Sequence, residues 1–175
     1  MYWHYLSGKW FLNIYQEIHH QSFTFWQNPK IYNIFFHPSC GFLLYTPLMW
    51  FTLVGMAWMA LKNQYNGRLI GLIFLIITYT YGSWCIWSLG HTYSYRAFID
   101  FYPLMVFGLA FYINELLKSK NQHFKFINFV IFISLIIINL RFTIVPFYWQ
   151  VDSEATNLQD FWKAWFWVFD FSKWN

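Results

Sequence analysis

Apolar residues are concentrated in four long runs that short polar segments separate. The runs cover residues 42–61, 69–89, 97–117 and 126–146, and the first two contain no charged residue. A helix needs about 20 predominantly apolar residues to cross the hydrocarbon core of a bilayer. The runs have this length, and they lack the alternating strands of about 10 residues that a membrane barrel requires. The pattern therefore predicts four transmembrane helices.

The two ends of the chain carry a different pattern, in which apolar residues recur at helical spacing. In residues 1–18 these positions are Trp3, Leu6, Trp10, Ile14 and Ile18, and in the C-terminal segment they are Phe161, Trp165, Val168 and Phe169. Such spacing predicts amphipathic helices in the membrane interface, whereas the alternative is that both ends are only aromatic belts. The chain is therefore predicted to have three parts: an outer-face segment 1–41, a transmembrane region 42–146 and an outer-face segment 147–175.

The composition strengthens the membrane interpretation. Hydrophobic residues make up 58% of the 175 residues, aromatic residues 27% and charged residues only 10%, compared with about 25% charged in soluble domains. The chain is thus predicted to be an all-α, polytopic integral membrane protein with the lipid bilayer as its partner. Its net charge of +4 is not gathered into a basic stripe, which argues against nucleic acid as a partner.

Basic residues predict how the helices are oriented. The first and third loops contain no acidic residue, and their basic residues are Lys62, Arg68, Lys118, Lys120 and Lys125. Short loops rich in Lys and Arg remain in the cytoplasm. This distribution predicts that the second loop, around residues 91–96, and both termini lie on the outer side of the membrane.

The richest polar segment, SLGHTYSYRAFIDFYP, covers residues 88–103. Arg96 and Asp100 are four residues apart, so on an α-helix they would share a face and pair, with His91 close by. A guanidinium binds phosphate through two parallel hydrogen bonds, and a neighbouring carboxylate would hold it in place. One interpretation is therefore a phosphate-binding site at the outer surface. The other is that Arg96 only anchors the helix by reaching the lipid headgroups.

A second polar segment, residues 27–42, contributes Lys30 and His37, which would lie at the same outer surface. The chain contains no nucleophile between a strand and a helix and no glycine-rich phosphate loop. Paired acids for acid–base chemistry are missing too, because outside the Arg96–Asp100 pair the only outer acid before the third span is Glu17. Cys40 and Cys85 lack the spacing of metal ligands. The residues therefore predict no catalytic group, no metal site and no cofactor in this chain.

Four motifs follow one another in an order that resembles a known family. Over nearly the whole chain, they are similar to the C-terminal portion of bacterial, Bacteroidetes-type polytopic membrane proteins. Those proteins are related to GT-C glycosyltransferases of the dolichyl-phosphate-mannose protein mannosyltransferase kind. The motifs are YWHYLSGKWFLNIYQ, FWQNPKIYNIFFHPSCGFLLYTP, YGSWCIWSLGHTYSYRAFIDFYP and NLRFTIVPFYWQVDSEATNLQDFW.

The resemblance implies a glycosyltransferase that takes a sugar from a polyprenyl-phosphate carrier at the periplasmic face of the bacterial inner (cytoplasmic) membrane. In the relatives, the positions matching Gly90, Arg96 and Asp100 belong to a Gly-x-x-(Gly/Tyr)-x-Arg-like turn on the outer face. This chain departs from that pattern, because Tyr95 stands where relatives often have a glycine.

The resemblance also implies that part of the enzyme is missing. The family's catalytic acid lies in the first outer loop of the full protein, before the point where this chain starts. We therefore expect a fragment, a truncated product or a split subunit that is inactive alone. Its partner would be the missing N-terminal membrane portion or another membrane protein. The alternative is a non-enzymatic integral membrane subunit or scaffold.

Overall fold

The computed structural model describes residues 5, 8, 21–38, 40–88, 94–148, 162 and 166, without the side chains of residues 143–148. Within this part of the chain every regular element is a helix, so the predicted all-α class is confirmed there. The predicted amphipathic end helices lie outside the described residues. The elements are α3 (Ile31–Phe36), α4 (Phe42–Tyr45), α5 (Met49–Leu61), α6 (Gly67–Ser83), the 3-10 helix η1 (Arg96–Phe101), α7 (Tyr102–Lys118) and α8 (Gln122–Tyr148).

Two helical segments are long and apolar enough to cross a membrane. They are Arg96–Lys118, which comprises η1 and α7, and Gln122–Phe142 of α8. The predicted first and second spans correspond to α5 and α6, which have 13 and 17 residues and are about 20 and 26 Å long at 1.5 Å per residue. The structure therefore supports two spanning helices by length and composition, and four are not shown.

The predicted first span is interrupted where Thr46 precedes Pro47. Thr46 has φ −124° and ψ 66° and closes α4 after four residues, and α5 begins only at Met49. A proline disfavours the helical conformation for the residue before it, which explains the break. The second span ends early as well, because Trp84 takes an extended conformation directly after Ser83.

Helices α5 and α7 cross at two glycines. A Cβ atom on Gly55 would lie 2.0 Å from the carbonyl oxygen of Gly108, and a Cβ on Gly108 would lie 2.3 Å from Cγ of Met56. Neither position has room for a side chain, so the two backbones approach as closely as the small-residue crossings of membrane helices do. The sequence interpretation did not single out either glycine, although each is an isolated glycine within an apolar run.

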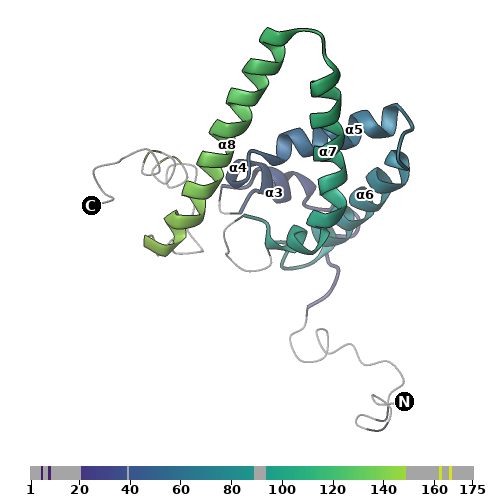
Figure 1. The fold of residues 1–175 in the computed structure, drawn as a ribbon. Helices are drawn as coiled ribbons and strands as arrows, with labels where there is room; N and C mark the ends of the chain where they lie inside the picture. The colour runs from purple at the N-terminus through teal and green to yellow at the C-terminus, as the bar shows by residue number, and fades with distance from the viewer. Residues whose placement is uncertain are drawn as a thin grey trace.

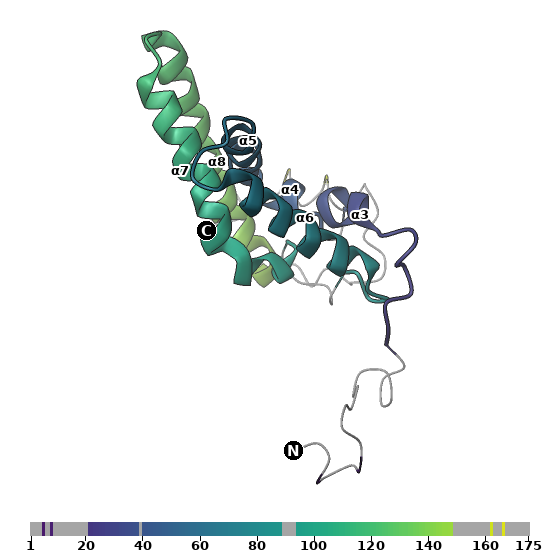
Figure 2. The same cartoon turned by 90° about the vertical axis from the view of Figure 1, so that its right-hand side faces the viewer.

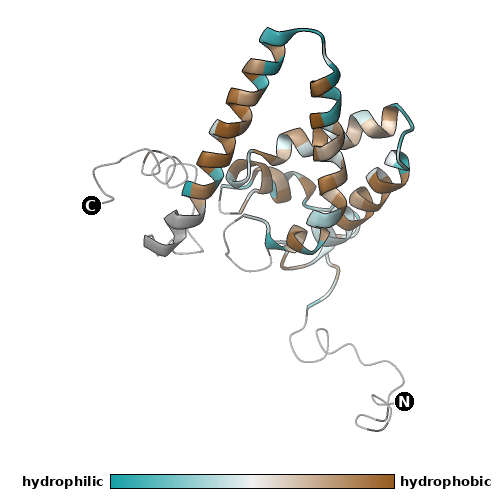
Figure 3. Cartoon of the chain, viewed as in Figure 1, coloured by the Kyte–Doolittle hydropathy of each residue, from teal (hydrophilic) through white to brown (hydrophobic). Residues whose placement is uncertain are grey.

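Helices α7 and α8 form a hairpin whose arms diverge from the connection at residues 119–121 (Figure 1). Apolar colouring covers most of both arms, and the connection between them is hydrophilic (Figure 3). In the perpendicular view, α7 and α8 lie along one edge of the molecule and α3 along the other, with α4, α5 and α6 between them (Figure 2). Of the two arms, α7 packs closely on α5, whereas most of the α8 surface is exposed.

Helix α8 buries a narrow stripe and exposes the rest of its circumference. The stripe follows helical spacing and includes two asparagines, whereas most of the exposed positions between residues 126 and 140 are Ile, Leu, Val or Phe. Polar groups turned inward and apolar groups turned outward are the arrangement of a helix whose solvent is lipid. The less exposed positions of the stripe are Lys125, Asn128, Phe132, Leu135, Asn139 and Phe142.

Candidate functional site

Residues 22–31 wrap around the C-terminal end of α6. The backbone N–H of Lys30 donates to the carbonyl oxygen of Gly82 at 2.8 Å, and that of Phe25 donates to Ser83 at 3.0 Å. In addition, the Tyr79 hydroxyl donates to the carbonyl oxygen of Trp26 at 2.6 Å. The last carbonyls of a helix have no partner within it, so these bonds satisfy groups that would otherwise need water. They join residues 22–31 to the end of α6.

An aromatic cluster joins η1 to the same end of the molecule. We define it by Phe35 on α3, Phe42 on α4, Phe74 on α6, and Tyr95 and Phe98 at η1. Phe98 is fully buried, and its ring centroid lies 4.8 Å from that of Phe42, 5.4 Å from Phe74 and 5.1 Å from Tyr95. Buried aromatic pairs add to the stabilisation from apolar burial, so this cluster holds η1 firmly.

The aromatic cluster fixes the backbone on both sides of Arg96. Tyr95, Ala97 and Phe98, the neighbours of Arg96, are buried, whereas the Arg96 side chain is exposed. The two polar segments also pack together, because Phe35 of α3 stacks on Phe98 of η1 with a centroid distance of 6.2 Å. The segments that carry Lys30, His37 and Arg96 therefore meet at one end of the fold.

Aromatic contacts hold Lys30 and His37 at this end. The Lys30 ammonium lies 4.8 Å from the centroid of the Phe25 ring, which is a cation–π contact. The His37 ring meets Trp87 edge-on at 5.0 Å. Both side chains are half-buried. The remaining predicted contact, His91, lies outside the described residues.

The structure does not show the predicted pair between Arg96 and Asp100. Both residues lie in a 3-10 helix, where residues four apart point about 120° away from each other because there are three residues per turn. Both side chains are exposed, and the ion pairs of the described residues do not include this one. Among those residues, the Arg96 guanidinium also has no hydrogen-bond partner. Its donors therefore remain available to an anion.

Tyr95 is a core residue of this site. Its side chain is 1% exposed, its hydroxyl has no hydrogen-bond partner, and burial raises the pKa of that hydroxyl. The buried Ser94 hydroxyl beside it has no partner either, and Ser94 has φ 56°. A glycine at position 95 could not supply the ring that contacts Phe98 and Tyr81. Tyr95 therefore has a packing role here.

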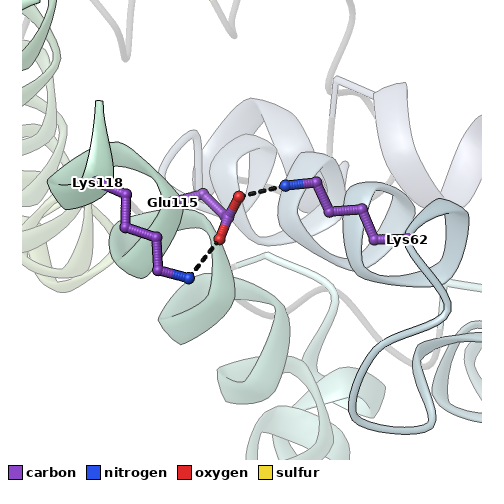
Figure 4. Close-up of polar contacts among 3 residues, drawn as sticks. All are labelled: Lys62, Glu115 and Lys118. Carbon is purple, nitrogen blue, oxygen red and sulfur yellow. Dashed lines mark hydrogen bonds and ion pairs between the residues drawn. The ribbon is translucent and has the colours of Figure 1, made fainter. Parts of the chain in front are cut away.

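A second polar group, which the sequence interpretation did not identify, joins the other ends of α5 and α7. The Glu115 carboxylate accepts hydrogen bonds from the ammonium groups of Lys62 and Lys118, and the latter distance is 2.9 Å (Figure 4). Lys62 follows α5 and Lys118 ends α7. The first and third loops, which were predicted to share one side, therefore begin at the same end of the fold.

A polar contact also attaches α8 to α7. The Tyr112 hydroxyl donates to Oδ1 of the buried Asn128 at 2.7 Å, and the Asn128 amide donates to the carbonyl oxygen of Phe124 at 2.9 Å. The rings of Phe51 and Phe132 lie 5.9 Å apart beside this contact. Asn128 and Asn139 are eleven residues apart, which is three helical turns. That spacing is the sequence signal that could have identified the inward face.

The site offers an exposed guanidinium at one end of a long apolar helix. Within the described residues, no three His, Cys, Asp or Glu side chains come together as a metal site would require. No family model, curated protein or solved structure matches the chain. The chemical properties of the described residues therefore carry the functional argument.

Proposed function

We propose that the chain is the membrane-embedded part of a lipid-linked sugar transferase of the GT-C type, and that it holds the phosphate of a polyprenyl-phosphate carrier. The observation that carries the proposal is the state of Arg96, which is exposed, fixed by buried neighbours and without a partner among the described residues. A planar guanidinium donates two parallel hydrogen bonds to a phosphate, which an ammonium cannot reproduce.

The surroundings of Arg96 support an anionic ligand. Lys30 and His37 belong to segments that pack at the same end, and their positive or titratable groups favour an anion there. Asp100 is exposed and separate from the guanidinium, so its role in this proposal is not to orient Arg96. Sugar transfer itself is assigned to another part of the transferase, because the described residues at this end bring no second acid together with Asp100.

The proposal also keeps the predicted membrane arrangement. It places four segments in the bacterial inner membrane, with both termini and Arg96 on the periplasmic side. The outward apolar face of α8 and the length of η1 with α7 support a membrane location. The joined ends of α5 and α7, with their three charged side chains, support a common cytoplasmic end for the first and third loops.

Binding of a polyprenyl phosphate to the full chain in phosphatidylcholine nanodiscs tests the proposal. Arg96→Lys keeps the charge but removes the two-pronged donor, so it should weaken binding by about 1–3 kcal/mol, the scale of a charged hydrogen bond. Arg68→Lys is the matched control, because Arg68 is another exposed arginine without a described partner, located at the start of α6. It should leave binding unchanged.

Two further results make the test decisive. Asp100→Asn should cause no loss of affinity, since the carboxylate does not contact the guanidinium. Thermal unfolding should be the same for wild type and Arg96→Lys, because lysine can reach the same headgroups. Equal affinity of wild type and Arg96→Lys would contradict the phosphate site. It would leave Arg96 as an anchor and favour the alternative of a non-enzymatic membrane subunit or scaffold.

A further inference from the structure

One end of the described fold carries the excess positive charge of the chain. Its basic residues lie in or beside the two connections that join α5 to α6 and α7 to α8, and both connections are hydrophilic (Figure 3). We call this surface the basic end. Its basic residues are Lys62, Arg68, Lys118, Lys120 and Lys125, and its one acidic residue is Glu115.

The charges of the rest of the chain cancel. The chain has 11 basic and 7 acidic residues and a net charge of +4. Five of the basic residues and one of the acidic residues belong to the basic end, which leaves six of each kind elsewhere. The net charge of the whole chain therefore equals the net charge of the basic end.

The single acid of the basic end is covered by two of its lysines. The Glu115 carboxylate accepts hydrogen bonds from the ammonium groups of Lys62 and Lys118 (Figure 4). The Glu115 side chain is 10% exposed, whereas those of Lys62 and Lys118 are 40% and 63% exposed. Arg68 and Lys120 are exposed and have no ion-pair partner among the described residues. The surface of the basic end is therefore positive.

Packing between the connections holds these charges together. Tyr65 of the first connection meets the Phe111 ring of α7 edge-on at a centroid distance of 6.2 Å. A Cβ atom on Gly67 would lie 2.5 Å from the carbonyl carbon of Met59, so the start of α6, where Arg68 follows, lies against the last turn of α5. The fold thus gathers basic residues that are far apart in the sequence.

Exposed apolar side chains lie among the basic residues. A bilayer interface accommodates both kinds, because headgroup phosphates attract the basic groups while apolar side chains reach the acyl chains. A soluble anion or a nucleic acid would match the charges but leave the apolar side chains in water. The exposed apolar residues are Leu61, Tyr65, Leu69, Leu117, Phe124 and Phe126.

We propose that the basic end is a binding surface for anionic phospholipids of the surrounding bilayer, whose phosphate groups contact Arg68, Lys120 and Lys125. Charge complementarity supports this partner, since a basic surface beside a membrane attracts anionic headgroups and salt weakens that attraction. Neither Arg96 nor a sugar carrier takes part in this binding. The lipid surface therefore goes beyond the proposed function and shares with it only the membrane location.

Electron paramagnetic resonance of spin-labelled lipids measures the preference. The full chain is reconstituted in phosphatidylcholine vesicles that contain a trace of spin-labelled phosphatidylglycerol or phosphatidylcholine, and the immobilised fraction gives the relative association of each lipid. We expect phosphatidylglycerol to be preferred about fivefold, roughly the effect of one basic residue beside an anionic surface. The preference should fall as the salt concentration rises.

Three double variants locate the preference on the chain. Lys120→Gln with Lys125→Gln removes two charges from the basic end and should reduce the preference to below about twofold. Lys120→Arg with Lys125→Arg keeps both charges and should retain it. Gln27→Glu with Asn28→Asp lowers the net charge by the same two units at exposed positions in residues 22–31 and should leave it unchanged. Thermal unfolding of each variant verifies that it folds.

Several outcomes would overturn the lipid surface. One is equal association of both lipids with the wild type. Another is an equal loss in the Gln and the acidic double variants, which would assign the preference to net charge alone. Displacement of spin-labelled phosphatidylglycerol by inorganic pyrophosphate or a DNA oligonucleotide at constant ionic strength would favour a soluble phosphate or nucleic acid instead. None of these results depends on Arg96, so the proposed function stands or fails separately in its own binding test.

Discussion

The aromatic cluster and helix α8 use the same residue types in opposite ways. In the cluster, Phe42, Phe74, Tyr95 and Phe98 are buried, and the neighbouring Arg96 is exposed. On α8, most phenylalanines and isoleucines are exposed, whereas Asn128 is buried. A buried apolar cluster is stabilised by removal from water or by close packing, whereas a helix with an apolar exterior needs an apolar solvent. The contrast teaches that hydrophobicity alone does not determine which side chains form the core.

The largest difference between the two regions should appear when one phenylalanine is removed from each. Phe98→Ala deletes a fully buried ring that contacts four others, so the free energy of unfolding should fall by about 3–5 kcal/mol. Phe129→Ala removes an exposed ring of α8 and should change the free energy of unfolding by about 0.5 kcal/mol or less. Reversible unfolding in detergent micelles measures both. Equal losses would contradict the assignment of the core.

The glycine crossing should give a smaller effect. Gly55→Ala places a methyl group against the Gly108 carbonyl and should destabilise the protein by about 1–3 kcal/mol through overpacking. Gly71→Ala in α6 is the control, because a Cβ there meets no atom within 4 Å, and it should stabilise the helix by about 0.5–1 kcal/mol. Thermal unfolding compares the two variants. If Gly55→Ala were as stable as Gly71→Ala, the close crossing of α5 and α7 would be refuted.

The smallest effect should come from the polar contact that holds α8. Tyr112→Phe removes the hydroxyl that donates to Asn128 and should cost about 1 kcal/mol. Tyr32→Phe changes an exposed tyrosine of α3 and should be neutral. A double-mutant cycle with Asn128→Leu isolates the contact, since the two changes should not be additive if the residues interact. Additive losses would show that α8 is held by other contacts.

The sequence pattern predicted some features of the fold well and others poorly. Helical structure in the four apolar runs followed from their composition, and residues 97–117 and 126–146 correspond to the two long helical segments. The first run is not one helix, because Pro47 disfavours the helical conformation of Thr46 and separates α4 from α5. The second ends at Ser83, where Trp84 is extended and the distant residues Phe25 and Lys30 hydrogen-bond to the carbonyl oxygens of Ser83 and Gly82.

The candidate site shows the same division. Arg96 is exposed, and the segments that carry Lys30, His37 and Arg96 pack together, whereas their location at an outer membrane surface stays a prediction. The predicted pairing of Arg96 with Asp100 is not shown, because it assumed α-helical spacing where the chain forms a 3-10 helix. The contact of Glu115 with both Lys62 and Lys118 was missed because Lys62 is 53 residues away along the chain.

The sequence by itself determined which stretches are helical and apolar and which few residues carry charge, because these properties depend on local composition and spacing. The tertiary structure decided where helices end, which glycines meet, which face of α8 is inward and whether Arg96 has a partner. Those features depend on packing and hydrogen bonds between residues far apart in the chain, such as Gly55 with Gly108 and Lys30 with Gly82. Local patterns contain no information on which distant segment will supply the contact.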